Sequence, residues 1–270
     1  MEMGYTLWRL RGASEMPAAA IAPPFLDTPE HPRPEAPKAA VAVTAESSGN
    51  LAAAPRAARP EPETRLEAPV SPDVRAEEIA RIARMGWEEL EAAIRACRAC
   101  TLCRQRRQAV PGVGDRAADW LFVGEGPGAE EDLQGEPFVG QAGKLLDAML
   151  AAINLKRGEK VYIANAVKCR PEGNRTPQHG EMETCFPFLR RQIELIRPKI
   201  IVLLGKAAVY SVLREEKTLA ALRKKPLCHE EIPVVVTYHP AYLLRNLPEK
   251  AKAWEDFCLA RHVLRAQRTK

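Results

Sequence analysis

Four cysteines are the residues of this 270-residue chain whose type and spacing point most directly to chemistry. Cys97 and Cys100 are separated by two residues, and Cys169 and Cys185 follow much further along the chain. Thiolates are soft ligands that select zinc, copper(I) or iron–sulfur clusters. The spacing is not that of a zinc finger, so we expect a site assembled by the fold and leave its occupant open. Cys103 extends the first pair and is one further candidate ligand.

Three polar residues each follow an apolar run, where a strand of the fold would end. Glu125 lies in the glycine-rich turn 124–128 and can position or activate a water molecule. Asn165 offers a donor and an acceptor together, which suits the edge of a nucleobase. His239 can donate a hydrogen bond to an oxygen that gains negative charge. The turn lacks the Lys-Ser/Thr pair of a P-loop, so it favours a binding or catalytic turn over a nucleotide-phosphate loop.

Two further segments contain side chains suited to a flat ligand or to DNA. Phe138 lies between a proline and a glycine, and stacking on a ligand or burial in the core are equally good interpretations. Leu243, Leu244 and Arg245 combine apolar wedges with a cation. Such a combination can fill the gap left by an extruded base and hold the phosphate backbone. Glu131 suits either a binding role or the positive end of a helix dipole.

The apolar pattern of residues 75–270 predicts a three-layer α/β/α domain. Four short runs are apolar throughout rather than alternating, as expected of strands buried on both faces. A turn and a helical pattern follow each run, which implies a mostly parallel four-stranded central sheet with ligands at the carboxyl ends of the strands. The predicted strands are 120–123, 161–164, 200–204 and 234–237. The predicted helices are about 72–98, 143–153, 177–196, 206–213 and 248–266.

The first third of the chain differs in composition from the rest. Twelve of the 23 prolines precede Asp73, among alanines, glutamates and serines that cannot bury enough apolar surface to fold. We therefore expect residues 12–74 to form a disordered linker. Within residues 1–11, the amphipathic segment Tyr5–Leu10 is either the apolar start of a disordered tail or a docking peptide for a partner protein. The chain contains no apolar run of about 18 residues, so we expect no membrane span.

The charge distribution indicates the kind of partner that the protein binds, and the cysteine content indicates how its thiols are used. Residues 1–75 contain 8 basic and 10 acidic residues, whereas residues 76–270 contain 32 and 25, a net charge of +7. A modestly basic folded part suits an anionic partner such as nucleic acid. Seven cysteines without a secretion signal favour metal or cluster ligation over a disulfide framework. We expect Cys228 and Cys258 to be small buried side chains.

Together, these motifs resemble those of the family 4 uracil-DNA glycosylases of bacteria and archaea, the iron–sulfur members of their superfamily. The resemblance covers about residues 85–265, with seven separated motifs in the expected order. These are Cys97-x2-Cys100, Gly124–Asp132, Gly135–Gly140, Asn165, Lys168–Pro177, Cys185 and His239–Arg245. The resemblance implies a monofunctional DNA repair hydrolase. Such an enzyme flips deoxyuridine out of DNA and hydrolyses its N-glycosidic bond, releasing uracil and leaving an abasic site.

The resemblance implies a cofactor and a division of catalytic roles. Glu125 would position the attacking water, Asn165 would read the edge of uracil, and His239 would stabilise uracil O2. We expect the cofactor to be structural, because glycosidic hydrolysis needs no redox step. A zinc-stabilised enzyme of the same fold is the alternative. The [4Fe–4S] cluster would be held by Cys97, Cys100, Cys169 and Cys185.

The resemblance also implies which residues contact the base and the DNA. Uracil would stack on Phe138, and Glu131 would help to exclude the methyl group of thymine. The uracil-binding residues would be Gly126, Pro127, Gly128, Glu131, Phe138 and Asn165. The DNA-binding residues would be Arg175, Tyr242, Leu243, Leu244 and Arg245. Basic residues beside the cysteines can either grip phosphates or simply be solvated; they are Arg104, Arg106, Arg107, Lys168, Arg170 and Arg175.

Two alternatives of the same fold are a non-catalytic DNA-binding protein and a relative that traps DNA covalently. Covalent trapping uses a histidine in the segment after the third cysteine. Here that segment, 172–177, contains no histidine, and the nearest, His179, lies beyond the proline, so ordinary turnover is favoured. We expect a monomer in the bacterial cytosol that acts on single- or double-stranded uracil-containing DNA and does not associate with membranes.

Overall fold

A six-stranded sheet forms the centre of the folded part of the protein, which the computed structural model describes over residues 72–267. The strand order is β1-β3-β2-β4-β6-β5. The four inner strands are parallel and confirm the four predicted ones: β2 (Trp120–Gly124), β3 (Val161–Asn165), β4 (Ile200–Leu204) and β6 (Ile232–Thr237). Two edge strands pair with them in antiparallel fashion: β1 (Val113–Gly114) and β5 (Leu227–His229). The apolar pattern does not indicate these edge strands because they have only two and three residues.

The longer helices lie close to their predicted positions, and several short ones connect them. The longer helices are α4 (Gln141–Ala152), α5 (His179–Ile196), α6 (Lys206–Leu213) and α9 (Lys250–Gln267). The short helices are α3 (Ala129–Gln134), α7 (Leu219–Leu222) and α8 (Pro240–Arg245). Three 3-10 turns are η1 (Thr101–Arg104), η2 (Glu172–Asn174) and η3 (Leu247–Glu249). Among these, α3 begins directly after the glycine-rich turn 124–128, and α8 begins directly after His239.

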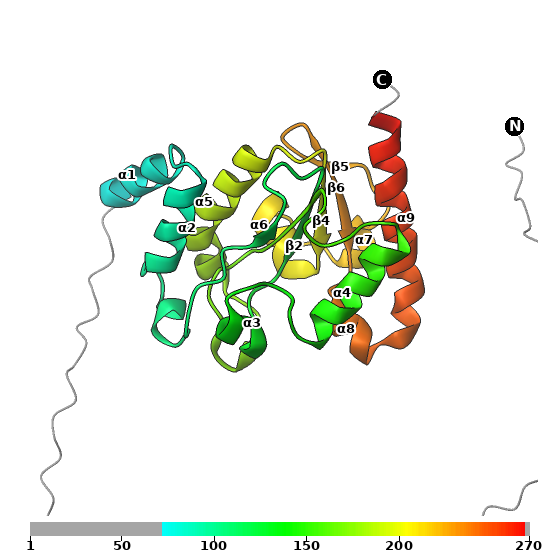
Figure 1. Ribbon diagram of the computed structural model, residues 1–270, viewed down its shortest axis with the longest axis horizontal. Helices are drawn as coiled ribbons and strands as arrows, with labels where there is room; N and C mark the ends of the chain where they lie inside the picture. Colours follow the sequence, from blue (N-terminus) through cyan, green and yellow to red (C-terminus); the bar gives the residue numbers. More distant parts are fainter. Residues whose placement is uncertain (1–71, 268–270) are drawn as a thin grey trace, which may run out of the picture. The chain divides into compact units, whose positions relative to one another are not determined.

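Helices cover both faces of the sheet, and Figure 1 shows α5 and α9 on opposite sides of the strands. On one face, Leu121 of β2 packs in a buried cluster with Leu189 of α5. On the other face, the neighbouring Phe122 packs in a second cluster with Phe257 of α9. Successive residues of a strand point to opposite faces, so a strand covered on both sides is apolar at every position. The predicted α/β/α architecture is confirmed.

The single N-terminal helix predicted from the sequence is two helices, α1 (Pro72–Ile82) and α2 (Trp87–Ala96). The chain is extended at Gly86, which precedes α2, and its N–H donates to the carboxylate of Glu89 at 3.3 Å. The apolar pattern continues across this break, which is why it suggested one helix. Since α2 ends at Ala96, Cys97 is the first residue beyond its carboxyl end. Both helices pack against α5 through a third buried cluster that includes the cysteines.

The remaining predictions concern other parts of the chain. The prediction that Cys228 is buried is wrong, because it lies on the edge strand β5 and is exposed, while Cys258 in α9 is partly exposed. The segment Tyr5–Leu10 and almost all of the linker predicted over 12–74 lie outside the described residues. None of the described helices combines the length and apolar character that crossing a bilayer requires.

Candidate active site

A cavity of about 770 Å³ opens at the carboxyl ends of the inner strands. Its lining includes Glu125 after β2, Asn165 at the end of β3, Gly205 after β4 and His239 after β6. Parallel strands present their carboxyl ends at the same edge of a sheet, which is where ligands of such folds bind. The sheet therefore brings four segments that are distant in sequence around one cavity.

Most of the predicted site residues line this cavity. They are Glu125, Gly126, Pro127, Gly128, Glu131, Phe138, Asn165, Arg175, His239, Tyr242 and Arg245. The two leucines predicted as DNA wedges differ from each other: Leu244 is 41% exposed, whereas Leu243 is fully buried beside Trp254 and Phe257. The structure is at odds with a DNA contact by Leu243, because α8 turns that side chain inward.

Phe138 forms one wall of the cavity and lies close to the other recognition groups. Its ring centroid is 5.4 Å from that of His239. Gly124 makes the approach possible, because a Cβ there would lie 2.5 Å from the ring of Phe138 and 2.5 Å from Oδ1 of Asn165. That Oδ1 is buried and has no hydrogen-bond partner among the described residues. The wall thus presents an aromatic face beside an acceptor that still needs a donor.

The imidazole of His239 is neutral and has a defined tautomer. Its Nδ1 accepts a hydrogen bond from the backbone N–H of Ala241 at 3.2 Å, so the ring proton is on Nε2. Burial, with a smaller effect of the positive charge of Arg245, lowers the pKa of His239 to about 4, while Glu131 acts weakly in the opposite direction. At neutral pH the side chain is therefore a neutral N–H donor at the cavity.

Glu125 is a partly buried carboxyl group whose pKa is raised above its ordinary value, because the effect of burial exceeds that of its hydrogen bond. Burial raises its pKa, and a hydrogen bond with the side chain of Thr176 lowers it. Thr176 also lines the cavity, but the sequence analysis does not single it out. The carboxylate is thus placed beside the cavity with one hydroxyl that favours its charged form, as required of a group that orients water.

Glu131 uses both carboxylate oxygens to hold the backbone around the cavity. One oxygen accepts from the N–H of Gly128 at 3.0 Å, and the other accepts from the N–H groups of Val139 and Gly140 at 3.0 and 3.1 Å. The first bond belongs to the glycine-rich turn and the other two to the segment after Phe138. Glu131 therefore ties the two turns together, a positioning role that its helix-start position alone does not reveal.

The four predicted ligand cysteines lie together around a second, small cavity. Cys97, Cys100, Cys169 and Cys185 all line it, and Cys103 does not. Burial is the main cause that raises the pKa of Cys169 to about 11 and that of Cys185 to about 12. Within residues 72–267, no three His, Cys, Asp or Glu side chains are grouped as a single metal ion requires. The donor set is all thiol, which suits a soft metal centre.

Arg106 accompanies the cysteine cavity rather than a free phosphate-binding surface. Its Nη1 donates to Sγ of Cys169 at 2.7 Å, and its Nη2 donates to the carbonyl oxygens of Arg95 and Cys97 at 2.8 Å each. The guanidinium thus links the chain beyond α2 to the third cysteine. Because its donors are engaged in this way, the prediction that Arg106 grips phosphates is not supported.

Comparison with known proteins agrees with this geometry. The model of the uracil DNA glycosylase superfamily matches residues 111–258. The chain is 46% identical over 156 residues to a type-4 uracil-DNA glycosylase of Archaeoglobus fulgidus, covering 55% of this chain and 78% of the relative. It is 46% identical over 143 residues to one of Thermotoga maritima, covering 52% and 74%. A type-5 uracil-DNA glycosylase of Pyrobaculum aerophilum is 32% identical over 153 residues, covering 51% and 67%.

The chain belongs to the type-4 uracil-DNA glycosylases. The fold and family inferred from the sequence motifs are therefore confirmed. The matched residues 111–258 contain the three strand-end residues Glu125, Asn165 and His239 and two of the four clustered cysteines, whereas Cys97 and Cys100 precede them.

In this type-4 glycosylase, Lys168 connects the cysteine cavity to the active-site cavity. The prediction that it grips phosphates is wrong, because Lys168 is 1% exposed. Its Nζ donates to the backbone oxygen of Asn165 at 3.0 Å and to Oε1 of Gln192 at 2.7 Å. Its backbone N–H donates to Sγ of Cys185 at 3.3 Å. One buried residue thus contacts a predicted cluster ligand and supports the strand end that presents Asn165.

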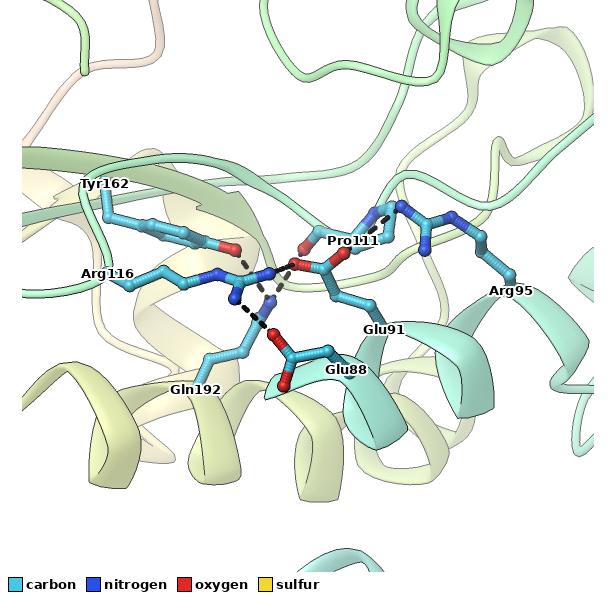
Figure 2. A network of polar contacts seen from close by, with 7 residues as sticks. All are labelled: Glu88, Glu91, Arg95, Pro111, Arg116, Tyr162 and Gln192. Carbon is cyan, nitrogen blue, oxygen red and sulfur yellow. Dashed lines mark hydrogen bonds and ion pairs between the residues drawn. The ribbon is translucent and has the colours of Figure 1, made fainter. Parts of the chain in front are cut away.

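Gln192 of α5 extends this contact to the segment before β1 and to Tyr162 of β3. Its Nε2 donates to the backbone oxygen of Pro111 at 2.9 Å and to the hydroxyl of Tyr162 at 3.4 Å (Figure 2). Beside these groups, Arg116 forms ion pairs with two carboxylates of α2, those of Glu88 at 2.8 Å and Glu91 at 2.9 Å (Figure 2). These polar contacts therefore tie α5 to β3, and separately tie α2 to the segment between β1 and β2.

Several cavity residues of the glycosylase are not identified by the sequence analysis. Lys206 follows β4 and is exposed at the start of α6, and Tyr238 follows β6 and stacks on Tyr242 with ring centroids 5.3 Å apart. Both directly follow a glycine or threonine at a strand end, so the rule that identified Asn165 and His239 could have found them. Thr176 has no such signal, since it lies in an irregular segment after η2.

Replacing Lys168 by methionine is expected to lower the free energy of unfolding. The change leaves the backbone oxygen of Asn165 and Oε1 of Gln192 without their buried donor, at about 1–3 kcal/mol for each unsatisfied group. Denaturant titration of the full-length protein measures the loss. Lys144→Met, at an exposed position of α4, is the control and is expected to stay within about 0.5 kcal/mol of the wild type. Equal stability of both variants would contradict the role of Lys168.

Proposed function

We propose that this protein removes uracil from DNA by flipping deoxyuridine into the cavity and hydrolysing its N-glycosidic bond. The observation that carries the proposal is the convergence of Phe138, Asn165 and His239 on one cavity at the strand ends. The type-4 relatives named above are uracil-DNA glycosylases. A base inside a duplex is out of reach of such a cavity, so the nucleotide must be extruded, which costs a few kcal/mol.

The chemistry of uracil fits the groups around the cavity. Its flat ring suits the face of Phe138, and its edge alternates oxygen acceptors with one N–H donor. The unpartnered Oδ1 of Asn165 supplies an acceptor for that donor, and the other end of the amide supplies a donor for O4. The free Nε2–H of His239 supplies a donor for O2. This pairing explains why a buried amide oxygen is left without a partner in the protein.

The proposed catalysis depends on stabilising the charge that develops while the N-glycosidic bond breaks. Negative charge accumulates on the departing base, and the donor positioned to meet it is Nε2–H of His239. Within residues 126–128 only Gly126 can add a backbone N–H, because Pro127 has none and that of Gly128 is bonded to Glu131. A preorganised donor of this kind contributes roughly 2.7–4 kcal/mol to the transition state. The carboxylate of Glu125 orients the water that attacks the sugar carbon. Because water is the proposed nucleophile, the products are free uracil and an abasic site, and the DNA strand stays intact.

Replacing His239 by alanine is expected to lower kcat/KM for uracil release roughly 10²–10³-fold, because one charge-stabilising donor is lost. The assay measures free uracil and alkali-labile sites from a uracil-containing oligonucleotide. Since the pKa of His239 is about 4, its imidazole is neutral at neutral pH, and the wild-type profile should show no step from this group there. Wild-type protein that releases no uracil, or an alanine variant of equal activity, would refute the proposed function.

Replacing Thr176 by valine is expected to move the acidic limb of the kcat/KM profile to higher pH. The hydrogen bond of Thr176 lowers the pKa of Glu125, so its loss raises that pKa and the reactive carboxylate is protonated at a less acidic pH. Thr176→Ser keeps the hydroxyl and serves as the control, with an unchanged limb. If the limb stays in place in the valine variant, a different group limits the reaction at low pH.

We further propose that Cys97, Cys100, Cys169 and Cys185 hold a [4Fe–4S] cluster. The supporting observation is that these four thiols, and not Cys103, line the small cavity beside Lys168 and Arg106. When bound, the cluster would crosslink the segment after α2 to the segment after β3. Uracil hydrolysis is carried by other residues, so the proposed role of the cluster is structural.

Chemical analysis of anaerobically purified protein tests the cluster. About four iron atoms and four acid-labile sulfides per chain are expected. Cys169→Ser is expected to lose the metal and to unfold at lower temperature, whereas the control Cys103→Ser keeps the full complement. Bound zinc without sulfide would overturn the proposal in favour of a zinc-stabilised enzyme.

We propose that residues at the rim of the cavity and on α8 contact DNA. Arg175, Tyr242 and Arg245 line the cavity, and the exposed Leu244 lies beside them on α8. We propose that Leu244 fills the space left by the flipped nucleotide, while Arg245 contacts a phosphate. Arg175 also donates to both carboxylate oxygens of Glu181, at 2.9 and 2.7 Å, so its proposed phosphate contact would share the guanidinium with this ion pair. The protein would act as a monomer in the cytosol, and Tyr5–Leu10 would bind a protein partner. The covalent alternative is not favoured, since η2 and the residues up to Pro177 contain no histidine.

A further inference from the structure

The backbone at Phe138 adopts a conformation that an aromatic residue rarely takes. Its φ is +57°, in the left-handed region that favours glycine. Such a conformation persists only where the surrounding structure over-determines it. The direction of the Phe138 ring toward the cavity depends on this turn, so the contacts that hold the turn also set the wall on which a base would stack.

Two charged side chains hold the turn from opposite sides. On the amide side, Glu131 accepts from the N–H groups of Val139 and Gly140, as described above. On the carbonyl side, Arg157 donates from Nη1 to the oxygen of Pro137 and from Nη2 to the oxygen of Phe138, both at 2.8 Å. The carboxylate of Glu131 thus accepts from the N–H groups of this turn, and the guanidinium of Arg157 donates to its carbonyl groups. Together these contacts fix the orientation of the peptide planes in the turn.

Arg157 is itself fixed by α4 and stands outside the active-site cavity. Its Nε donates to Oδ1 of Asp147 at 3.0 Å, and its Nη2 lies 2.9 Å from the same oxygen. Its side chain is 23% exposed, and it is absent from the residues that line the cavity. The same helix approaches the turn closely at Gly143, where a Cβ would collide with the backbone oxygen of Phe138. The carbonyl side of the turn is therefore built against α4.

We propose that Arg157 is a positioning residue for base recognition, acting through the backbone of Phe138 and never touching the base. The inference rests on the proposed function and adds a residue to its site. Only a planar, forked guanidinium reaches two neighbouring carbonyls and a carboxylate at once, so lysine is not an equivalent replacement. Loss of the fork frees the carbonyls of Pro137 and Phe138, and the ring then leaves its stacking position.

The test is a double-mutant cycle on uracil release, using Arg157→Met, Phe138→Ala and the double variant in the full-length, metal-loaded protein. Arg157→Met is expected to lower kcat/KM by up to about 10²-fold, and to weaken inhibition by free uracil in parallel, because misplacement of a recognition group is costly. In the Phe138→Ala background the same change is expected to have little further effect. Additive losses, or unchanged inhibition by uracil, would overturn the inference.

Two further variants separate this outcome from a general loss of structure. Arg116→Met removes an arginine with two ion pairs remote from the cavity, and is expected to leave uracil inhibition unchanged. Arg157→Lys keeps the charge, so it supplies the cycle if the methionine variant does not fold, and is expected to show the same coupling to Phe138. If wild-type protein and Arg116→Met release no uracil, the proposed function fails; if they release it and the coupling is absent, only the inference about Arg157 fails.

Discussion

The active-site cavity depends on one carboxylate, that of Glu131, which accepts three backbone hydrogen bonds from two separate turns. One turn follows β2 and lines the cavity, and the other orients Phe138. Without this anion, three partly buried N–H groups would lack their partner. The relative position of the aromatic wall and the donors is therefore fixed by the short helix α3, which places Glu131 between them.

A second constraint runs from the cysteines to the same cavity. Lys168 is fully buried, and its Nζ donates to the carbonyl of Asn165 and the amide oxygen of Gln192. Its backbone N–H donates to the thiol of Cys185, and its carbonyl oxygen accepts from the N–H of Val110. Burial lowers the pKa of its ammonium group to about 8, while the neighbouring Cys185 and Cys169 act in the opposite direction. The end of β3, which presents Asn165, is thus supported from the side on which the four cysteines lie.

Two kinds of residue are predictable from the sequence. One kind lies where an apolar strand ends, and the other has a side chain whose type and spacing indicate metal ligation. Asn165 and His239 were identifiable because each terminates an apolar run, and parallel strands must bring such residues together. The four cysteines were identifiable from their type and spacing. Thr176 and Arg157 were not, and neither was the tie that Glu131 makes between two turns, because these roles depend on contacts that only the folded turns create. The burial of Leu243 and Lys168 likewise follows from the packing of α8 and α5, which the pattern of single residues does not encode.

The account's central claim is that uracil lies against Phe138, with its edge read by Asn165 and its O2 held by Nε2 of His239. A crystal structure of the full-length protein with bound uracil tests it most directly. The account predicts the base stacked on Phe138, with the side-chain amide of Asn165 and Nε2 of His239 both within hydrogen-bonding distance. Uracil bound elsewhere, or bound in this cavity with Oδ1 of Asn165 still lacking a donor, would contradict it.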